Sequence, residues 1–157
     1  CSKFHNLRAI VEVIYLTMSR RGEVLDLKRT DVDYMHRVAV LRETKDNQSS
    51  TGKDRKIGLS PRAVELLQQQ PKSVSGLYFP IRSISAFEKA FKRAVKRADI
   101  TDFHMHDLRH CRATDLVEIH GWNTVELMQQ GGWTSADMVK RYANISPKHL
   151  ARKLKQS

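Results

Sequence analysis

The sequence predicts one α+β domain, mainly α-helical, with a small antiparallel β-hairpin or three-stranded sheet at one edge. Apolar residues recur every three or four positions in several segments, and capping signals separate these segments. Two short aliphatic segments flank a polar loop, which is typical of a hairpin. A length of 157 residues suits one domain with a real hydrophobic core.

The first half of the chain predicts two helices followed by the hairpin. Residues 3–17 place apolar side chains at helical spacing, so this helix is expected to face the core. Ser19 is the expected N-cap of a second helix over residues 20–27. Residues 37–44 and 55–59 are expected to form two strands joined by the polar loop.

The second half predicts further helices and one more extended segment. Ser60-Pro61 combines a capping serine with a proline at the first helical position, so a helix is expected to begin there. Residues 76–80 are short and apolar and predict a third strand or an extended segment. The remaining predicted helices are residues 83–97, the run after the His-rich stretch up to about residue 120, residues 123–128, a segment opened by Ser135, and a basic helix opened by Ser146-Pro147.

The composition favours a polyanionic partner. Lys and Arg number 28 against 17 Asp and Glu, which gives a formal net charge of +11. Nucleic acid is the commonest partner of such a chain, and a soluble basic protein without one is the alternative. The helix predicted over residues 83–97 carries positive charge opposite its apolar stripe, a pattern that a solvated surface would also show. Its candidate DNA contacts are Lys89, Lys92, Arg93 and Lys96.

The chain has few cysteines and no sign of a membrane or secretory segment. Cys1 and Cys111 imply no disulfide framework, which fits a reducing compartment. No apolar run approaches the roughly 20 residues of a membrane span, and Arg8 and Glu12 interrupt the first apolar segment. We therefore expect a cytoplasmic protein without a membrane partner. The chain begins without Met in a segment that already looks helical, so an excised domain is expected.

The densest group of reactive side chains lies in residues 103–110, which hold three His and one Arg. His106 and Arg109 are three residues apart and share one face if a helix begins here. A planar guanidinium beside an imidazole suits a phosphate group. Two alternatives stay open at this point: metal binding by His104, His106 and His110, and an ordinary surface.

Cleaving a phosphodiester without a metal requires cations on the phosphate, a nucleophile and an acid for the leaving oxygen. Arg20 and Arg109, with His106, can supply the cations and a further donor. Arg20 opens its predicted helix, where a positive charge opposes the helix dipole, and this hints at a role outside the helix. Lys45 on the hairpin loop can supply the proton. Tyr142 is the candidate nucleophile, although core packing is the alternative for any single tyrosine.

Four sequence blocks follow one another in a fixed order. They are Thr17 to Leu27, with an Arg three residues before an acidic residue; Glu43-Thr44-Lys45; His106-Asp107-Leu108-Arg109-His110; and Gly131-Gly132-Trp133, with Tyr142 nine positions after Trp133. In this order and spacing the chain resembles the catalytic domain of the tyrosine recombinase (phage integrase) family. The resemblance covers nearly all of residues 1–157 and implies a helical catalytic domain from which the family's N-terminal DNA-binding domain is absent.

The resemblance implies a DNA strand transferase that works without a metal, another cofactor or ATP. Tyr142 would attack a DNA phosphodiester, form a 3′-phosphotyrosyl bond and release a 5′ oxygen, which Lys45 would protonate. Glu23 would orient Arg20. The residues holding the phosphate would be Arg20, His106, Arg109 and Trp133. It further implies double-stranded DNA as substrate, a homo-oligomer on DNA, expected to be a tetramer, a monomer when alone, and a prokaryotic host.

Two departures from the family pattern concern site residues. Trp133 stands where most members have His, and its indole N–H can still donate to a phosphate. The hairpin loop is long, so Lys53 is a rival to Lys45. Three alternative functions stay open: a type IB topoisomerase-like nicking-closing enzyme, a non-catalytic DNA-binding relic, and a metal hydrolase built on the His cluster.

The segment around Tyr142 lies between two natural hinges, the glycine pair before it and Ser146-Pro147 after it. We therefore expect this segment to be loosely held, with Tyr142 lying away from Arg20 and Arg109 in the free chain. We also expect the tail to take part in assembly, and the sequence leaves open whether it docks in cis or on a neighbouring protomer.

Overall fold

The computed structural model describes residues 6–42, 54–81 and 83–142, and it confirms the predicted mainly helical fold with a three-stranded antiparallel sheet. The basic helix predicted after Ser146-Pro147 lies outside the described residues. In chain order the elements are α1 (Leu7–Thr17), α2 (Arg21–Leu25), the 3-10 helix η1 (Arg29–Asp31), β1 (Val32–Asp33), β2 (Val38–Leu41), β3 (Arg55–Gly58), α3 (Pro61–Gln68), α4 (Ile84–Arg97), α5 (Asp107–Glu118), α6 (Thr124–Gly131), α7 (Ala136–Val139) and the 3-10 helix η2 (Lys140–Tyr142).

The sheet has the strand order β1-β2-β3, and its third strand is not where the apolar pattern placed it. The pair β2 and β3 forms the predicted hairpin, with Ala39 opposite Ile57. The third strand is β1, whereas residues 76–80 make only one isolated bridge, from Leu77 to Lys28. Tyr78 and Phe79 in that segment are buried in the core. The apolar run there reflects burial and not strand pairing.

Three described helices begin with a side-chain cap, and two of these caps, Ser60 and Asn123, confirm the prediction. The Ser60 hydroxyl accepts from the Ala63 N–H at 3.2 Å, and the Ser83 hydroxyl accepts from the Ala86 N–H at 3.3 Å. Asn123 forms a full capping box at the start of α6. These side chains satisfy backbone donors that the first helical turn leaves without partners.

The start of α2 differs from the prediction, since its N-cap is Arg20 and not Ser19. The Arg20 backbone is extended, and its N–H donates to the Glu23 carboxylate at 2.6 Å. A carboxylate three residues into the helix can cap the preceding N–H whatever the side chain of the capping residue. The start of α2 therefore rests on the Glu23 carboxylate and not on a serine hydroxyl.

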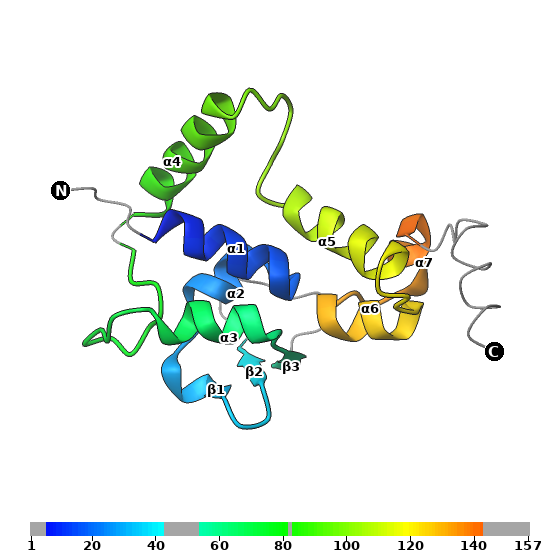
Figure 1. The fold of residues 1–157 in the computed structure, drawn as a ribbon, viewed down its shortest axis with the longest axis horizontal. Helices are drawn as coiled ribbons and strands as arrows, with labels where there is room; N and C mark the ends of the chain where they lie inside the picture. The colour runs from blue at the N-terminus through cyan, green and yellow to red at the C-terminus, as the bar shows by residue number, and fades with distance from the viewer. Residues whose placement is uncertain (1–5, 43–53, 82, 143–157) are drawn as a thin grey trace.

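The core consists of two clusters of buried apolar residues. The first cluster packs helices α1, α2, α3 and α4 against the sheet. The second cluster packs α5, α6, α7 and η2 together. In Figure 1 the sheet with α1, α2 and α3 lies on one side, α6 and α7 lie on the other, and α5 runs alongside α1 between them. The described part of the chain contains no helix long and apolar enough to cross a membrane.

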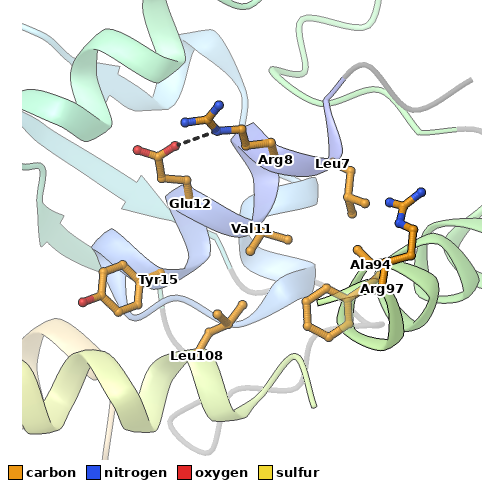
Figure 2. Close-up of a pocket in the computed structure, with 9 residues that line it drawn as sticks. Leu7, Arg8, Val11, Glu12, Tyr15, Ala94, Arg97 and Leu108 are labelled. Carbon is orange, nitrogen blue, oxygen red and sulfur yellow. Dashed lines mark ion pairs between the residues drawn. The ribbon is translucent and has the colours of Figure 1, made fainter. Parts of the chain in front are cut away.

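An open groove of about 580 Å³ lies between α1, α4 and α5. Its floor is mostly apolar, and Figure 2 shows Val11 and Leu108 among the side chains that line it. Arg8 and Glu12 form an ion pair across one rim at 3.9 Å, and Arg97 stands on the opposite side. The groove therefore separates the outward-standing helix α4 from the rest of the first cluster.

Replacing Leu67 with Ala should destabilise the fold strongly, because this side chain is fully buried in the first cluster. The expected loss in the free energy of unfolding is about 2–5 kcal/mol, measured by urea denaturation. Met35→Ala is the matched control, since Met35 is almost wholly exposed and its loss should change stability by less than about 0.5 kcal/mol. Equal effects of the two substitutions would contradict the assigned core.

Candidate active site

The buried carboxylate of Glu23 holds two arginines in place. Its side chain is only 3% exposed, and it pairs with the Arg20 guanidinium at 3.3 Å. The Arg55 guanidinium binds the same carboxylate through two hydrogen bonds, of 3.2 Å from Nε and 2.8 Å from Nη2. A fork-like contact of this kind fixes orientation as well as charge. Glu23 thus compensates two cations while leaving part of Arg20 open to solvent.

Arg55 also ties α2 to the turn that ends α6. Its Nη1 donates to the Gln130 carbonyl oxygen. Gly132, two residues after Gln130, has φ +67°. It packs so closely against the Arg55 side chain that an added Cβ would lie 2.7 Å from the Arg55 Nε. A glycine is required there both for the left-handed backbone and for the close approach. One side chain from β3 therefore links the two core clusters.

Arg109 on α5 is the most deeply buried cation of the site, with 2% of its surface exposed. Its Nη2 donates to the Gly131 carbonyl oxygen at 2.7 Å, and its guanidinium lies 5.0 Å from the centre of the Trp133 ring. Its Nε and Nη1 have no hydrogen-bond partner among the described residues. Buried donors of this kind require a partner, and the planar guanidinium suits a phosphate.

Burial, followed by the charge of the nearby Arg20, lowers the pKa of Arg109 to about 10, while Glu23 opposes this shift. The side chain therefore stays protonated at neutral pH. Two neighbouring guanidinium groups that repel one another are stabilised by an anion between them. The electrostatics of the site favour a bound phosphate.

His106 lies at the start of α5, close to the same charges. Partial desolvation lowers its pKa, and the charges of Arg109, His110 and Arg20 act in the same direction. Its ring meets that of His110 edge-on, with centroids 4.7 Å apart. At neutral pH the imidazole is therefore uncharged and can donate one N–H to an anion held by the arginines.

Tyr142 lies inside this group of side chains, at 8% exposure. Its ring packs against Trp133 and His110, with centroids 5.6 and 5.8 Å away, and its hydroxyl is hydrogen-bonded to His110 Nδ1. Burial raises the pKa of Tyr142, while the charges of Arg141 and Arg109 partly lower it. The expectation that Tyr142 lies away from Arg109 is therefore wrong, because the aromatic contacts hold η2 against α5.

The remaining predicted site residues fall into two groups. Lys45 and its rival Lys53 lie outside the described residues. The basic side chains predicted to contact DNA are all exposed along α4: Lys89, Lys92, Arg93 and Lys96. Within the described segments, no three His, Cys, Asp or Glu side chains are grouped as a metal-ligand set. His104 instead lies 3.5 Å from Asp107, and His110 faces the tyrosine.

Two residues of the site were not assigned from the sequence. His110 follows His106 by four positions, so the two share a helix face, and this spacing could have marked it. Arg55 gave no local signal, because its partners Glu23 and Gln130 lie 32 and 75 positions away. Only the packing of β3 against α2 and α6 places it there.

The glycine before Trp133 permits a test of this packing. An added Cβ at Gly131 would lie 2.2 Å from the Trp133 ring, so Gly131→Ala should displace the indole from Arg109 and Tyr142. Tryptophan emission, measured in a Trp122→Phe background, should shift and the melting temperature should fall.

Gly58→Ala provides the matched control for that substitution. An added Cβ at Gly58 would meet only the Gln130 side-chain oxygen, at an ordinary 3.7 Å. This variant should therefore keep the parent emission. If both glycine variants gave the parent spectrum, the close contact between Gly131 and Trp133 would be refuted.

Comparisons with known proteins agree with this geometry. Residues 2–149 match the model of the phage integrase family. The chain is 35% identical to a shufflon-specific DNA recombinase of Escherichia coli, covering 94% of this chain and 37% of that protein. It is 30% identical to the integrase of Salmonella phage P22, covering 96% and 42% respectively. It therefore spans less than half the length of these two relatives.

A solved structure supports the same assignment. The catalytic domain of bacteriophage HP1 integrase superimposes with a TM-score of 0.70 at 27% sequence identity, covering 96% of this chain and 81% of that one. The family model matches nearly the whole length, and the fold is that of a phage integrase catalytic domain. The chain belongs to the phage integrase family.

Proposed function

We propose that this chain is the catalytic domain of a site-specific DNA recombinase or integrase, which cuts and rejoins DNA strands through a covalent phosphotyrosyl intermediate. The observation that carries this proposal is the buried Arg109, which has two donors without a partner among the described residues and lies against Trp133, the ring on which Tyr142 packs. A phosphate bound by those donors would lie close to a tyrosine nucleophile. Family membership and the names of the two relatives support the same chemistry.

In the proposed reaction, the arginines bind the non-bridging oxygens of one DNA phosphate. Arg20 is oriented by Glu23, while Arg109 is oriented by the Gly131 carbonyl. The site therefore keeps its charges fixed before DNA arrives, which is the arrangement that favours a transition state over a ground state. His106 and the indole N–H of Trp133 add neutral donors.

Tyr142 then attacks the phosphorus, and the bond from phosphorus to the 5′ oxygen breaks. The leaving oxygen takes a proton, for which Lys45 is the proposed donor and Lys53 the rival. The 3′-phosphotyrosyl bond retains the energy of the broken phosphodiester, so a 5′-hydroxyl can attack it and restore the DNA. No metal or ATP takes part in this cycle.

The proposed partners are double-stranded DNA and further copies of the chain. A monomer alone and a tetramer on DNA, in the cytoplasm of a prokaryotic host, fit a recombinase that exchanges two pairs of strands. A type IB topoisomerase would use the same cleavage chemistry but would rejoin the original strands. Transfer of a cut strand to a second duplex distinguishes these two functions.

We expect cleavage to require the Tyr142 hydroxyl and both arginines. Nicked duplexes with a randomised core should trap this chain as a covalent adduct, recovered under denaturing conditions and sequenced to define the site. Tyr142→Phe should bind DNA normally and form no adduct, and Arg109→Ala should lose at least about 10²–10³ in cleavage rate. The adducts should form in excess EDTA.

Tyr34→Phe is the matched control, since its hydroxyl is hydrogen-bonded to the Tyr78 hydroxyl at 2.6 Å, away from the site. It should cleave at the parent rate. An adduct that persists in Tyr142→Phe, or cleavage that EDTA abolishes and magnesium restores, would disprove the proposed chemistry.

We also propose that the exposed basic face of α4 contacts the DNA backbone. Each phosphate contact contributes a slope of about −0.9 in a plot of log affinity against log salt. Changing Lys89, Lys92, Arg93 and Lys96 to Gln should therefore reduce the measured slope by up to about 3–4. Lys72→Gln, outside this face, should leave it unchanged. An unaltered slope in the fourfold variant would exclude α4 as the DNA contact.

A further inference from the structure

The Tyr142 hydroxyl has a specific partner that the proposed cycle does not yet use. His110 Nδ1 is hydrogen-bonded to it, and the two rings stack at an angle of 29°. His110 lies on α5, directly after Arg109, whereas the tyrosine comes from η2. The contact therefore crosses between two elements and joins the nucleophile to the helix that binds the phosphate.

The surroundings of His110 determine which protonation state it holds. The titratable and charged groups that face it are Tyr142 and Arg141 from η2, and His106, Asp107 and Arg109 from α5. Burial lowers the pKa of His110, the charges of Arg141 and Arg109 lower it further, and only Asp107 opposes them. At neutral pH the ring is therefore uncharged. When the tyrosine donates, Nδ1 carries the free lone pair and Nε2 carries the hydrogen.

We propose that His110 is the general base of the reaction and takes the proton of the Tyr142 hydroxyl as its oxygen attacks the phosphorus. This inference rests on the proposed function and adds a catalytic residue to it. As the bond from the tyrosine oxygen to phosphorus forms, the bond from phosphorus to the 5′ oxygen breaks. One proton moves from the tyrosine to His110 Nδ1, and one moves from the general acid to the leaving oxygen.

The same pair serves the reverse step without any further reagent. When a 5′-hydroxyl attacks the phosphotyrosyl bond, its proton returns to the general acid. The departing tyrosine oxygen then recovers its proton from His110. The imidazole is left uncharged, as it began.

A base is needed because the tyrosine is a poor nucleophile as it stands. A free phenol has a pKa of about 10, and burial raises the pKa of Tyr142. His106 is the other imidazole nearby, but its ring lies closer to the charges of Arg109 and Arg20, on the side that binds the phosphate. The two histidines, one helical turn apart, therefore have different roles in this proposal. His106 faces the phosphate, and His110 faces the nucleophile.

His110→Asn tests this assignment, because an amide can keep a hydrogen bond to the tyrosine but cannot accept its proton. DNA binding should be unchanged, and cleavage at pH 7 should fall by about 10²–10⁴. Because the pKa of His110 is lowered by burial, the rate of the parent should fall only at a pH below the ordinary pKa of a histidine, where His110 becomes protonated. The variant should lack this dependence, and its rate should rise about tenfold per pH unit as the phenolate fraction grows.

Two further variants keep the result decisive. In His110→Ala, added imidazole should restore cleavage, whereas it should not restore Arg109→Ala. His120→Asn makes the same change in the exposed turn after α5 and should cleave at the parent rate.

The outcomes separate this inference from the proposed function. If the parent forms an adduct on Tyr142 and His110→Asn cleaves at the parent rate and pH dependence, His110 is not the base and the function stands. Loss of activity in His110→Ala that imidazole does not restore would likewise assign His110 to positioning only. If the parent itself forms no phosphotyrosyl adduct, the proposed function fails.

Discussion

The site depends on a buried cation whose direct hydrogen bond goes to a neutral group. Arg109 is almost fully enclosed, donates to the Gly131 carbonyl and lies against the Trp133 ring. Taking a guanidinium out of water is costly, and a carbonyl oxygen with an aromatic face compensates only part of that cost. The part of the desolvation cost that stays uncompensated favours the binding of an anion in the site. The protein thus gives up stability at this point, and in the proposed function a bound phosphate would restore it.

A second constraint fixes the position of Arg109 relative to the rest of the site. Glu23 binds Arg20 and Arg55, and Arg55 reaches across to the Gln130 carbonyl. The N-terminal cluster and the C-terminal cluster therefore meet through charged groups and not through apolar packing alone. The two glycines that follow Gln130 make this possible, since a side chain at either position would meet the Trp133 ring or the Arg55 guanidinium. The glycine pair is thus a packing requirement as well as a turn.

The same geometry holds the tyrosine that we propose as the nucleophile. Tyr142 is fixed by aromatic contacts to Trp133 and by its hydrogen bond to His110, next to the ring that Arg109 contacts. Burial keeps the phenol protonated and unreactive. In the proposed mechanism, reactivity would require both a bound phosphate and a group that accepts the proton, which would limit the chemistry to the complex with DNA.

The sequence alone predicted most of the described helices and the candidate site residues. Caps such as Ser60 and Asn123 act on backbone groups three residues away, so a local pattern is sufficient to predict them. The block spacing likewise marked Arg20, Arg109 and Tyr142. Tertiary structure decided the rest: the third strand at β1, the cap of α2, and the partners of Arg55 and His110. Both Arg55 and His110 bind groups 32 positions away in the chain, and such contacts exist only after separate elements pack together.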